Sequence, residues 1–235
     1  MRNWLSFGGL DSRDFGVYIS GSGVFNAPER QYEMIEVPGR NGDLLGIERR
    51  MANIELTYPA FIYAKFKQQI TALKSAFLAK EGYQKLMDTY YPDEFRMAVF
   101  AGGTSVESVD RRNAGQFDLT FQCKPQRYLV TGQEEIDITT PLKLVNPTEF
   151  ASSPLIRVYG YGTLGINSES VTIANQYAYV DIDCEMMDCY YQTNNANPYV
   201  SFSSNDFPQL RPGTNTFTKT ANISQIKIVP RWWHV

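Results

Sequence analysis

The chain has 235 residues, of which 43% are hydrophobic and 20% are charged, and its formal net charge at pH 7 is −3. This length and apolar content suffice for one large domain or two ordinary ones, each with a buried core. The nearly balanced charge gives no indication of a nucleic-acid or membrane partner, either of which would favour a strongly basic chain.

The N-terminal half is dominated by short segments typical of β-strands. The chain begins with MRNWLSFGGLDSRDF, which lacks the apolar core and cleavage site of a signal peptide, so we expect synthesis in a cytoplasm. Alternating, β-branched or aromatic residues then predict strands in FGVYI (15–19), YEMIEV (32–37), NIELTY (53–58) and FDLTFQC (117–123).

The segment VPGRNGDLL (37–45) places a proline, two glycines and the pair Asn41-Gly42 between apolar runs. Asn-Gly tolerates the positive φ angles of a type I′ turn, so the sequence predicts a hairpin here. A phosphate-binding loop would need a helix after the glycines, whereas the strand-like LLGIERRMANIELTY follows. We expect residues 39–50 to form a projecting arm whose edge pairs with another copy of the protein. The candidate interface residues of this arm are Arg40, Asn41, Gly42, Asp43, Arg49 and Arg50.

One amphipathic helix is predicted within PAFIYAKFKQQITALKSAFLAKEG (59–82). Pro59 suits the first turn of this helix, and Gly82 suits its end. The apolar residues that recur at helical spacing are Phe66, Ile70, Leu73 and Phe77. This stripe should cover one face of a sheet. The residues expected to face water are Lys65, Lys67, Gln68 and Lys74.

A domain boundary is predicted in CKPQRYLVTG (123–132), because Pro125 and Gly132 interrupt the strand pattern that GYQKLMD and FRMAVF continue after the helix. A second β-rich unit follows, with strands in LIRVYG, SVTI, YAYVDIDCEM, TNTFTK and SQIKIVPRWW. We therefore predict a mainly β protein of two domains, residues 1–132 and 133–235. The first is an α+β domain, a β-sandwich or barrel with one helix and the hairpin arm, and the second is a β-sandwich or barrel.

Two motifs of catalytic or cofactor sites are present only in part. GYGTLG (160–165) fits the dinucleotide-binding pattern G-x-G-x-x-G, but that pattern requires a following helix, and INSESVTI predicts a turn and a strand. We interpret these glycines as a strand connection. His234, the only histidine, lies one residue from the C-terminus, where catalytic geometry is hard to hold.

The cysteines match no known metal or redox spacing. Cys123, Cys184 and Cys189 are odd in number, and the nearest pair has the spacing C-x4-C. We expect three reduced thiols.

An acidic run, YVDIDCEMMD, contains Asp181, Asp183 and Glu185 at steps of two, which places them on one face of a strand. Carboxylates in this pattern suit a calcium ion or a paired-carboxylate mechanism. The same residues are also explained by a half-buried strand whose acidic face is exposed to solvent. The alternate residues, expected to face the core, are Val180, Ile182, Cys184 and Met186.

Aromatic residues make up 14% of the chain, and most must fill the β cores. Tyr190, Tyr191 and Tyr199 surround the loop TNNANP and could form a platform on which a sugar stacks. This observation keeps a carbohydrate-binding β-sandwich module open as the alternative function. A glycoside hydrolase fragment, supported only by the abundant carboxylates, is a third possibility.

Several of these segments resemble bacteriophage distal tail proteins. SFGGLDSRDFGVYI, VPGRNGDL, the helix leading to GYQKL, and CKPQRYL are similar to the N-terminal domain of that family. NPTEFASSPLIRVYGYG, FPQLRPGTN and IKIVPRWW are similar to its C-terminal domain. The resemblance spans nearly the whole chain in the same order, and the ordered set is more specific than any one motif.

The resemblance implies a structural protein of a long, non-contractile phage tail. Six copies of the N-terminal domain would close a ring, single or stacked, that joins the tail tube to the tail tip or baseplate, and DNA would only pass through its lumen. A galectin-like C-terminal β-sandwich would carry receptor-binding or other baseplate proteins and serve host adsorption. The expected partners are other copies, the tail tube protein, a tail-tip protein and baseplate proteins, without a membrane. The resemblance implies a virion tail location after assembly in the host cytoplasm, no enzyme activity, no cofactor, and no catalytic or metal-binding residue.

Overall fold

The computed structural model describes residues 2–21, 23–102, 106–109, 113–204 and 206–235. The chain divides into two compact units: unit 1 is Met1–Arg127 together with Val235, and unit 2 is Tyr128–His234. The mainly β class with one α-helix is confirmed for the described residues. In this part of the chain no helix is long and apolar enough to cross a membrane.

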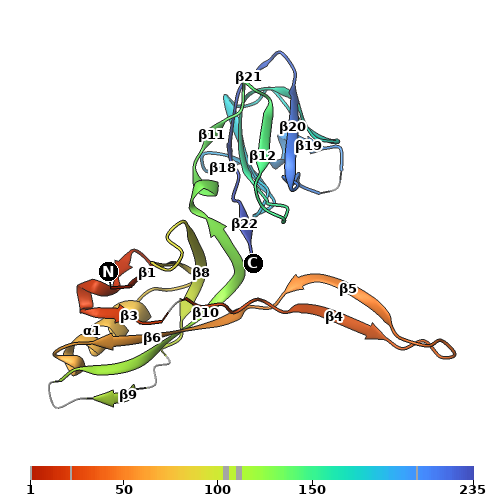
Figure 1. The fold of residues 1–235 in the computed structure, drawn as a ribbon. Coiled ribbons are helices and arrows are strands. Elements are labelled where there is room, and N and C mark those ends of the chain that lie inside the picture. Colours follow the sequence, from red (N-terminus) through yellow and green to blue (C-terminus); the bar gives the residue numbers. More distant parts are fainter. Residues whose placement is uncertain (1, 22, 103–105, 110–112, 205) are drawn as a thin grey trace. The chain divides into compact units, whose positions relative to one another are not determined.

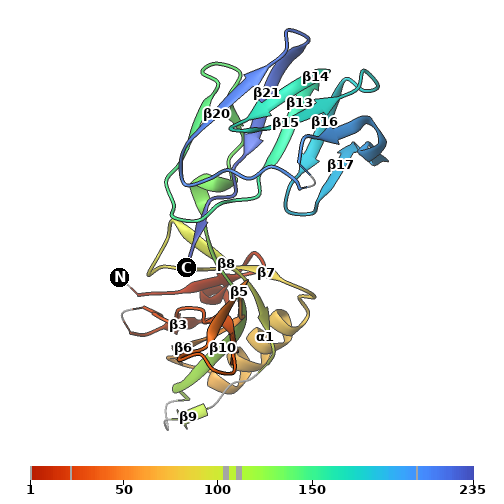
Figure 2. The ribbon, with the colours of Figure 1, turned by 90° about the vertical axis from the view of Figure 1, so that its right-hand side faces the viewer.

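Unit 1 is built on one antiparallel sheet with an α-helix against one of its faces (Figure 2). In hydrogen-bonding order its strands are β2 (Leu10–Asp11), β1 (Leu5–Phe7), β7 (Gln84–Asp88), β8 (Glu94–Phe100), β10 (Gly115–Leu129), β6 (Ile54–Ile62) and β3 (Val17–Ile19). A short strand, β9 (Val106–Val109), pairs with β10, and a 3-10 helix, η1 (Ser12–Phe15), connects β2 to β3. Two further strands, β4 (Arg30–Ile35) and β5 (Leu44–Met51), form a separate ribbon (Figure 1).

The helix α1 (Phe66–Leu78) covers the sheet with the predicted stripe, because Phe66, Ile70, Leu73 and Phe77 are all buried. The ring of Phe77 lies 5.2 Å from that of Phe7 between centroids. Burial along β6 alternates strictly up to Ala60, so one set of its side chains joins this core and the other faces away.

The predicted start of the helix at Pro59 is wrong, because Pro59 lies within β6 opposite Asp118 of β10. Its carbonyl accepts a hydrogen bond from Ser20 N (2.8 Å). Because proline has no N–H, Pro59 cannot donate a hydrogen bond to the Ser20 carbonyl in exchange. That carbonyl instead accepts a hydrogen bond from the hydroxyl of Tyr90 (2.7 Å). The helix begins only after Lys65, whose φ of 56° turns the chain away from the strand direction.

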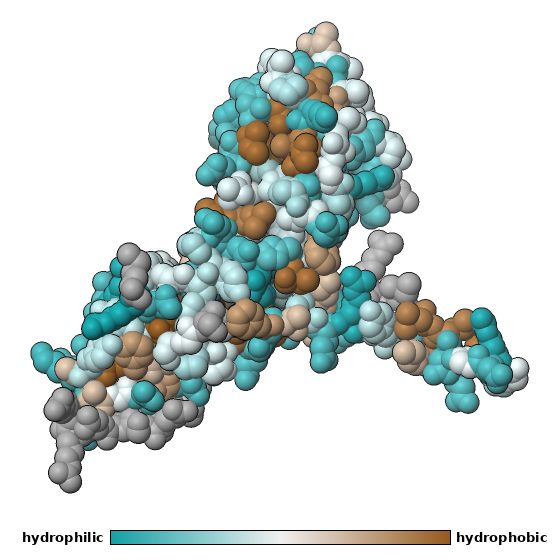
Figure 3. Space-filling view, viewed as in Figure 1, coloured by the Kyte–Doolittle hydropathy of each residue, from teal (hydrophilic) through white to brown (hydrophobic). Residues whose placement is uncertain are grey.

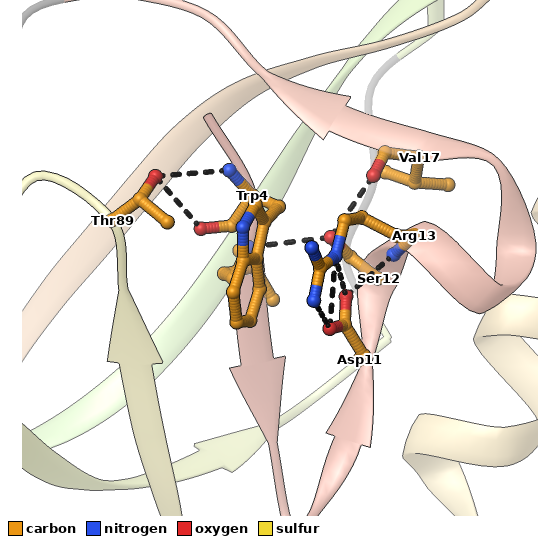
Figure 4. A network of polar contacts seen from close by, with 7 residues as sticks. Trp4, Asp11, Ser12, Arg13, Val17 and Thr89 are labelled. Atoms are coloured by element: carbon orange, nitrogen blue, oxygen red, sulfur yellow. Dashed lines mark hydrogen bonds and ion pairs between the residues drawn. The ribbon is translucent and has the colours of Figure 1, made fainter. Parts of the chain in front are cut away.

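A polar network holds the N-terminal strands and η1 together (Figure 4). The Ser12 hydroxyl donates to the Val17 carbonyl (2.9 Å) and is fully buried. Arg13 pairs with Asp11, and its guanidinium carbon lies 3.8 Å from the ring centroid of Trp4. These contacts fix the edge strand β3, after which the chain continues toward the β4–β5 ribbon.

Unit 2 is a β-sandwich, because two sheets contribute to a single buried core. One sheet has the order β11 (Ile136–Asp137), β21 (Ile223–Val229), β13 (Leu155–Gly160), β16 (Tyr179–Asp183), β17 (Asp188–Tyr191) and β18 (Asn194–Asn195). The other has the order β12 (Lys143–Asn146), β20 (Gly213–Lys219), β14 (Gly162–Ile166), β15 (Glu169–Ile173) and β19 (Val200–Phe202). The remaining short elements are η2 (Val130–Gln133), η3 (Asn197–Tyr199) and β22 (Trp233–His234).

The division between the units lies inside β10, a few residues before the predicted boundary at residue 132. The expectation that Pro125 interrupts the strand pattern is wrong, since β10 continues through it to Leu129. The Pro125 carbonyl accepts a hydrogen bond from Arg96 Nη1 (3.2 Å). That the two units fold separately stays a prediction.

The segment GYGTLG contains a strand connection, as interpreted from the sequence, because Gly160 ends β13 and Gly162 begins β14. A Cβ on Gly160 would lie 2.1 Å from the carbonyl oxygen of Asn222, and one on Gly162 would lie 2.1 Å from Oγ1 of Thr220. These positions therefore need glycine because neighbouring chain segments approach closely.

Candidate functional site

The ribbon β4–β5, here called the arm (residues 30–51), is the predicted hairpin. Among the described residues β4 and β5 pair only with each other, so both outer edges of the arm are open. The arm is longer than the predicted span of 39–50, because β4 contributes a full strand. At its base Ala52 N donates to the Glu29 carbonyl (3.2 Å), so the two chain ends of the arm lie side by side.

The chain reverses through an eight-residue loop, residues 36–43, rather than a two-residue turn. The prediction of a type I′ turn at Asn41-Gly42 is wrong, because Gly42 has a positive φ (81°) and Asn41 does not. Instead Arg40 N donates to the Val37 carbonyl (3.1 Å) across Pro38 and Gly39. Proline followed by a glycine with φ of 83° is the pattern of a type II turn.

The predicted interface residues fall into two groups at opposite ends of the arm. Arg40, Asn41, Gly42 and Asp43 are exposed in the loop. Arg50 is exposed near the base, seven positions from Asp43, or about 23 Å along the strand. The backbone of Arg49 belongs to β5, and its side chain lies outside what the structure describes. The structure does not bring the two groups together within one chain.

One face of the arm is apolar, which the sequence analysis missed. Met34 is directly opposite Leu45, and Tyr32 is two positions from Met34 along β4, so the three side chains share a face. Their exposed fractions are 52% for Tyr32, 65% for Met34 and 49% for Leu45. Figure 3 shows apolar atoms along the arm and polar atoms toward its tip. The alternation in YEMI was the available signal, but it was interpreted only as a strand.

The acidic run of unit 2 is neutralised by arginines. Asp181 accepts hydrogen bonds from Arg157 Nε (2.6 Å) and Nη2 (2.8 Å), and Asp183 is paired in the same two-point manner with Arg231 (2.7 and 2.8 Å). Both aspartates are almost completely buried, with 2% and 3% exposure. Burial raises the pKa of Asp183, but the hydrogen bonds and charge of Arg231, together with the hydrogen bonds from the backbone N–H groups of Met186 and Glu185, hold that pKa below its usual value.

The sequence predicted that carboxylates and core-facing residues alternate along this run, and that alternation holds only within β16. The strand ends at Asp183, and Glu185 lies in the turn that follows, 3.4 Å from Arg231. The expectation that Met186 faces the core is wrong, since it is 72% exposed. The turn breaks the two-residue alternation, as the positive φ of Met187 (54°) indicates. Because the carboxylate oxygens already accept bonds from arginines, the run is explained by ion pairing.

The tyrosines around TNNANP pack on other tyrosines. Tyr191 stacks on Tyr177 with 4.8 Å between centroids and 13° between planes, and Tyr199 meets Tyr177 edge-on at 5.6 Å. Tyr190 lies apart from them, opposite Asp181 in the strand register. The three tyrosines therefore do not form one open platform. The ring faces that Tyr177 and Tyr191 turn toward each other are not available to a sugar.

The three cysteines are free and buried. Burial raises the pKa of Cys123 and of Cys189 to about 12 and raises that of Cys184 further. Thiols in this state are poor nucleophiles. His234 is half-buried in β22.

Comparison with known proteins links unit 1 to phage tails. Residues 10–123 match one family model. That family is the phage tail protein RIFT-related domain. A comparison with curated protein sequences found no match for the chain. The RIFT-related match includes the whole arm, together with β3, β6, α1, β7 and β8.

Solved structures resemble the chain over its full length. The Dit protein of phage SPP1, described as a hub of the adsorption apparatus in phages infecting Gram-positive bacteria, has a TM-score of 0.78 and 13% identity, with 100% of both chains covered. Chains of the phage p2 baseplate in its activated conformation, solved with Ca and with Sr, have TM-scores of 0.53 and 0.52 and 10% identity. They cover 97% of this chain and 97% and 96% of their own. The solved structures therefore confirm the expected fold, and the family model confirms the likeness of residues 10–123 to a domain of phage tail proteins.

Proposed function

We propose that this protein is a structural component of the tail of a long-tailed, non-contractile phage, located at the distal tip. The observation that carries the proposal is the coincidence of two independent matches. Residues 10–123 match a domain of phage tail proteins, and the fold of the entire chain matches a phage hub protein.

In this proposal the copies join through the arm. An arm with two open strand edges and an exposed apolar face is unfavourable in water as a permanent state, because unpaired edges and apolar side chains gain from burial. If the arm contacts a different surface on the next copy, the contact is head-to-tail. Repeated contacts of this kind close into a ring when the rotation from one copy to the next is a whole fraction of a full turn. Six copies are expected from the family resemblance, with DNA passing through the lumen.

The two units have separate roles in the proposed assembly. Unit 1 forms the ring and contacts the tail tube protein and a tail-tip protein. The β-sandwich of unit 2, which we take to be galectin-like, carries receptor-binding or other baseplate proteins. This makes the protein a hub for host adsorption that is assembled in the host cytoplasm and then kept in the virion.

A scaffolding role rather than an enzymatic one is supported by the state of the reactive groups. The buried aspartates are engaged by arginines, and the buried thiols have raised pKa values.

Immunogold labelling of virions of the phage that carries this sequence tests the location. We expect gold at the distal end of the tail with antibodies against the purified chain, and none with pre-immune serum. Label on the capsid or spread along the tube would contradict the proposal, as would the absence of the chain from purified virions by mass spectrometry.

A further inference from the structure

The loop 36–43 at the end of the arm contains the only Asn-Gly pair of the sequence, Asn41-Gly42. Both residues are exposed, and both lie outside the paired strands, because the ladder of the ribbon ends where Ile35 is opposite Leu44. Asparagine before glycine is the dipeptide whose side-chain amide reacts most readily with the backbone that follows it, since glycine has no Cβ to crowd the attacking nitrogen. The geometry of this loop therefore decides whether the pair is reactive.

The structure leaves the two reacting groups unrestrained. Within the described residues, neither the side chain of Asn41 nor the N–H of Gly42 takes part in a hydrogen bond. Gly42 has a φ of 81°, and no atom of a neighbouring segment lies within 4 Å of the place where a Cβ would be. The amide of Asn41 can thus rotate toward the nitrogen of Gly42 without first breaking a hydrogen bond.

A second asparagine followed by a small residue, Asn167-Ser168, lies in the turn between β14 and β15 and is held in place. Its Nδ2 donates to Oδ1 of Asn215 (2.8 Å), and its Oδ1 accepts from the N–H of Thr216 (3.0 Å). Both hydrogen bonds must break before this amide can rotate, which costs free energy. The same chain therefore contains one unrestrained asparagine and one restrained one.

We propose that Asn41 is a site of spontaneous deamidation. The nitrogen of Gly42 attacks Cγ of Asn41 and loses its proton, and the side-chain amide leaves as ammonia, so that a five-membered succinimide forms. Water then adds to one of the two ring carbonyl carbons and opens the ring. Cleavage of the bond from Cγ to the nitrogen gives aspartate, and cleavage of the bond from the backbone carbonyl carbon gives isoaspartate. The sum of the steps consumes one water and releases one ammonia, without an oxidant or a reductant.

The modification changes the charge at the end of the arm. The loop carries the acidic residues Glu36 and Asp43 and the basic residue Arg40, and deamidation adds a third carboxylate. Isoaspartate also lengthens the backbone by one carbon between positions 41 and 42. Both changes fall outside the ladder of β4 and β5, so the strands of the arm stay paired. This chemistry does not depend on the proposed ring.

Peptide mapping by mass spectrometry tests the proposal in the full chain. The purified protein is incubated at neutral and at mildly alkaline pH, then digested with a protease that cuts after glutamate, and the free peptide VPGRNGDLL is incubated in parallel as the reference. We expect the fragment with Asn41 to gain the mass difference between a hydroxyl and an amino group, at a rate close to that of the free peptide and faster at the higher pH. The fragment with Asn167 should stay unchanged over the same time.

Gly42→Ala is the matched variant, because its added methyl group crowds the attacking nitrogen while the space around it is open. Asn41 should be modified more slowly in this variant than in the wild type, and thermal unfolding checks that the fold is intact. A rate at Asn41 far below that of the free peptide would overturn the proposal, since the loop would then protect the pair. Equal rates at Asn41 and Asn167, or in the wild type and Gly42→Ala, would also overturn it.

Discussion

At the residue scale, the buried aspartates of unit 2 show how charge is accommodated in a β-sandwich. Asp183 accepts two hydrogen bonds from Arg231 and two more from the backbone N–H groups of Glu185 and Met186. A carboxylate with all these donors is stable in its charged form although water is excluded. The pair links the end of β16 to the C-terminal segment of the chain.

We predict that Asp183→Asn destabilises the protein by about 3–5 kcal/mol, because it leaves the largely buried guanidinium of Arg231 without the buried carboxylate that pairs with it at two points. Urea unfolding followed by fluorescence measures this difference. Glu185→Gln is the matched control, since Glu185 is more exposed and lies 3.4 Å from the same arginine. It should cost less than about 1 kcal/mol. Equal effects of the two variants would contradict the assigned role of Asp183.

A second prediction concerns acid. Hydrogen bonds from Thr139 and Gln225 lower the pKa of Asp137 to about 2. An unfolded aspartate titrates near pH 3.9, so the folded state holds its charged form more strongly. The stabilisation by Asp137 is thus complete above about pH 4 and is lost as the pH falls toward 2. The stability difference between the wild type and Asp137→Asn should shrink across this range in acid titrations of unfolding. A difference independent of pH would count against this account.

These side-chain partners mark the limit of what the sequence predicts at this scale. The run of carboxylates was visible, but Arg157 and Arg231 are far from it along the chain and are brought to it only by the sheet register. The same pattern of carboxylates is compatible with ion pairing and with metal binding, and only the position of the arginines in the fold distinguishes the two.

At the scale of elements, local periodicity predicted well wherever one face is buried. The stripe of α1 is buried as expected, since helical spacing places its apolar residues on one side. The start of the helix was misplaced because Pro59 suits a helix N-terminus and also fits a strand position where no N–H is required. The arm was expected from its turn residues, but its apolar face depends on the pairing register of β4 and β5, which single-strand patterns do not reveal.

The connection between β13 and β14 gives a prediction at this scale. Gly160→Ala should cost more than about 2 kcal/mol, because φ is 99° and the added Cβ would meet the Asn222 carbonyl at 2.1 Å. Gly213→Ala is the control, since its φ is 78° and nothing lies within 4 Å of the added Cβ. It should cost only the backbone strain, about 1–2 kcal/mol. Thermal unfolding of both variants compares them, and an equal loss would argue against the close approach.

At the scale of the whole molecule, each unit has its own buried core, one formed around α1 and one between the two sheets of unit 2. We therefore predict that residues 1–127 and 128–235, expressed separately, each unfold cooperatively. Calorimetry of the two fragments tests this. If both fragments lost their cooperative transition, the units would depend on each other and the division would be wrong.

The central claim of the account is that the arm closes copies of the chain into a ring. Because Ala52 N bonds to the Glu29 carbonyl, residues 30–51 can be replaced by a Gly-Gly turn without stretching the chain. The triple variant Tyr32→Ser, Met34→Ser, Leu45→Ser keeps the arm and removes only its apolar face. Circular dichroism should show that unit 1 still folds in both variants.

Light scattering coupled to size exclusion measures the mass directly. The account predicts a mass near six times the 26.7 kDa of one chain for the intact protein, and the mass of a single chain for the variant without the arm. An intact protein that keeps the mass of one chain at high concentration and in the presence of purified tail tubes would contradict the claim. So would an armless variant with the mass of the ring.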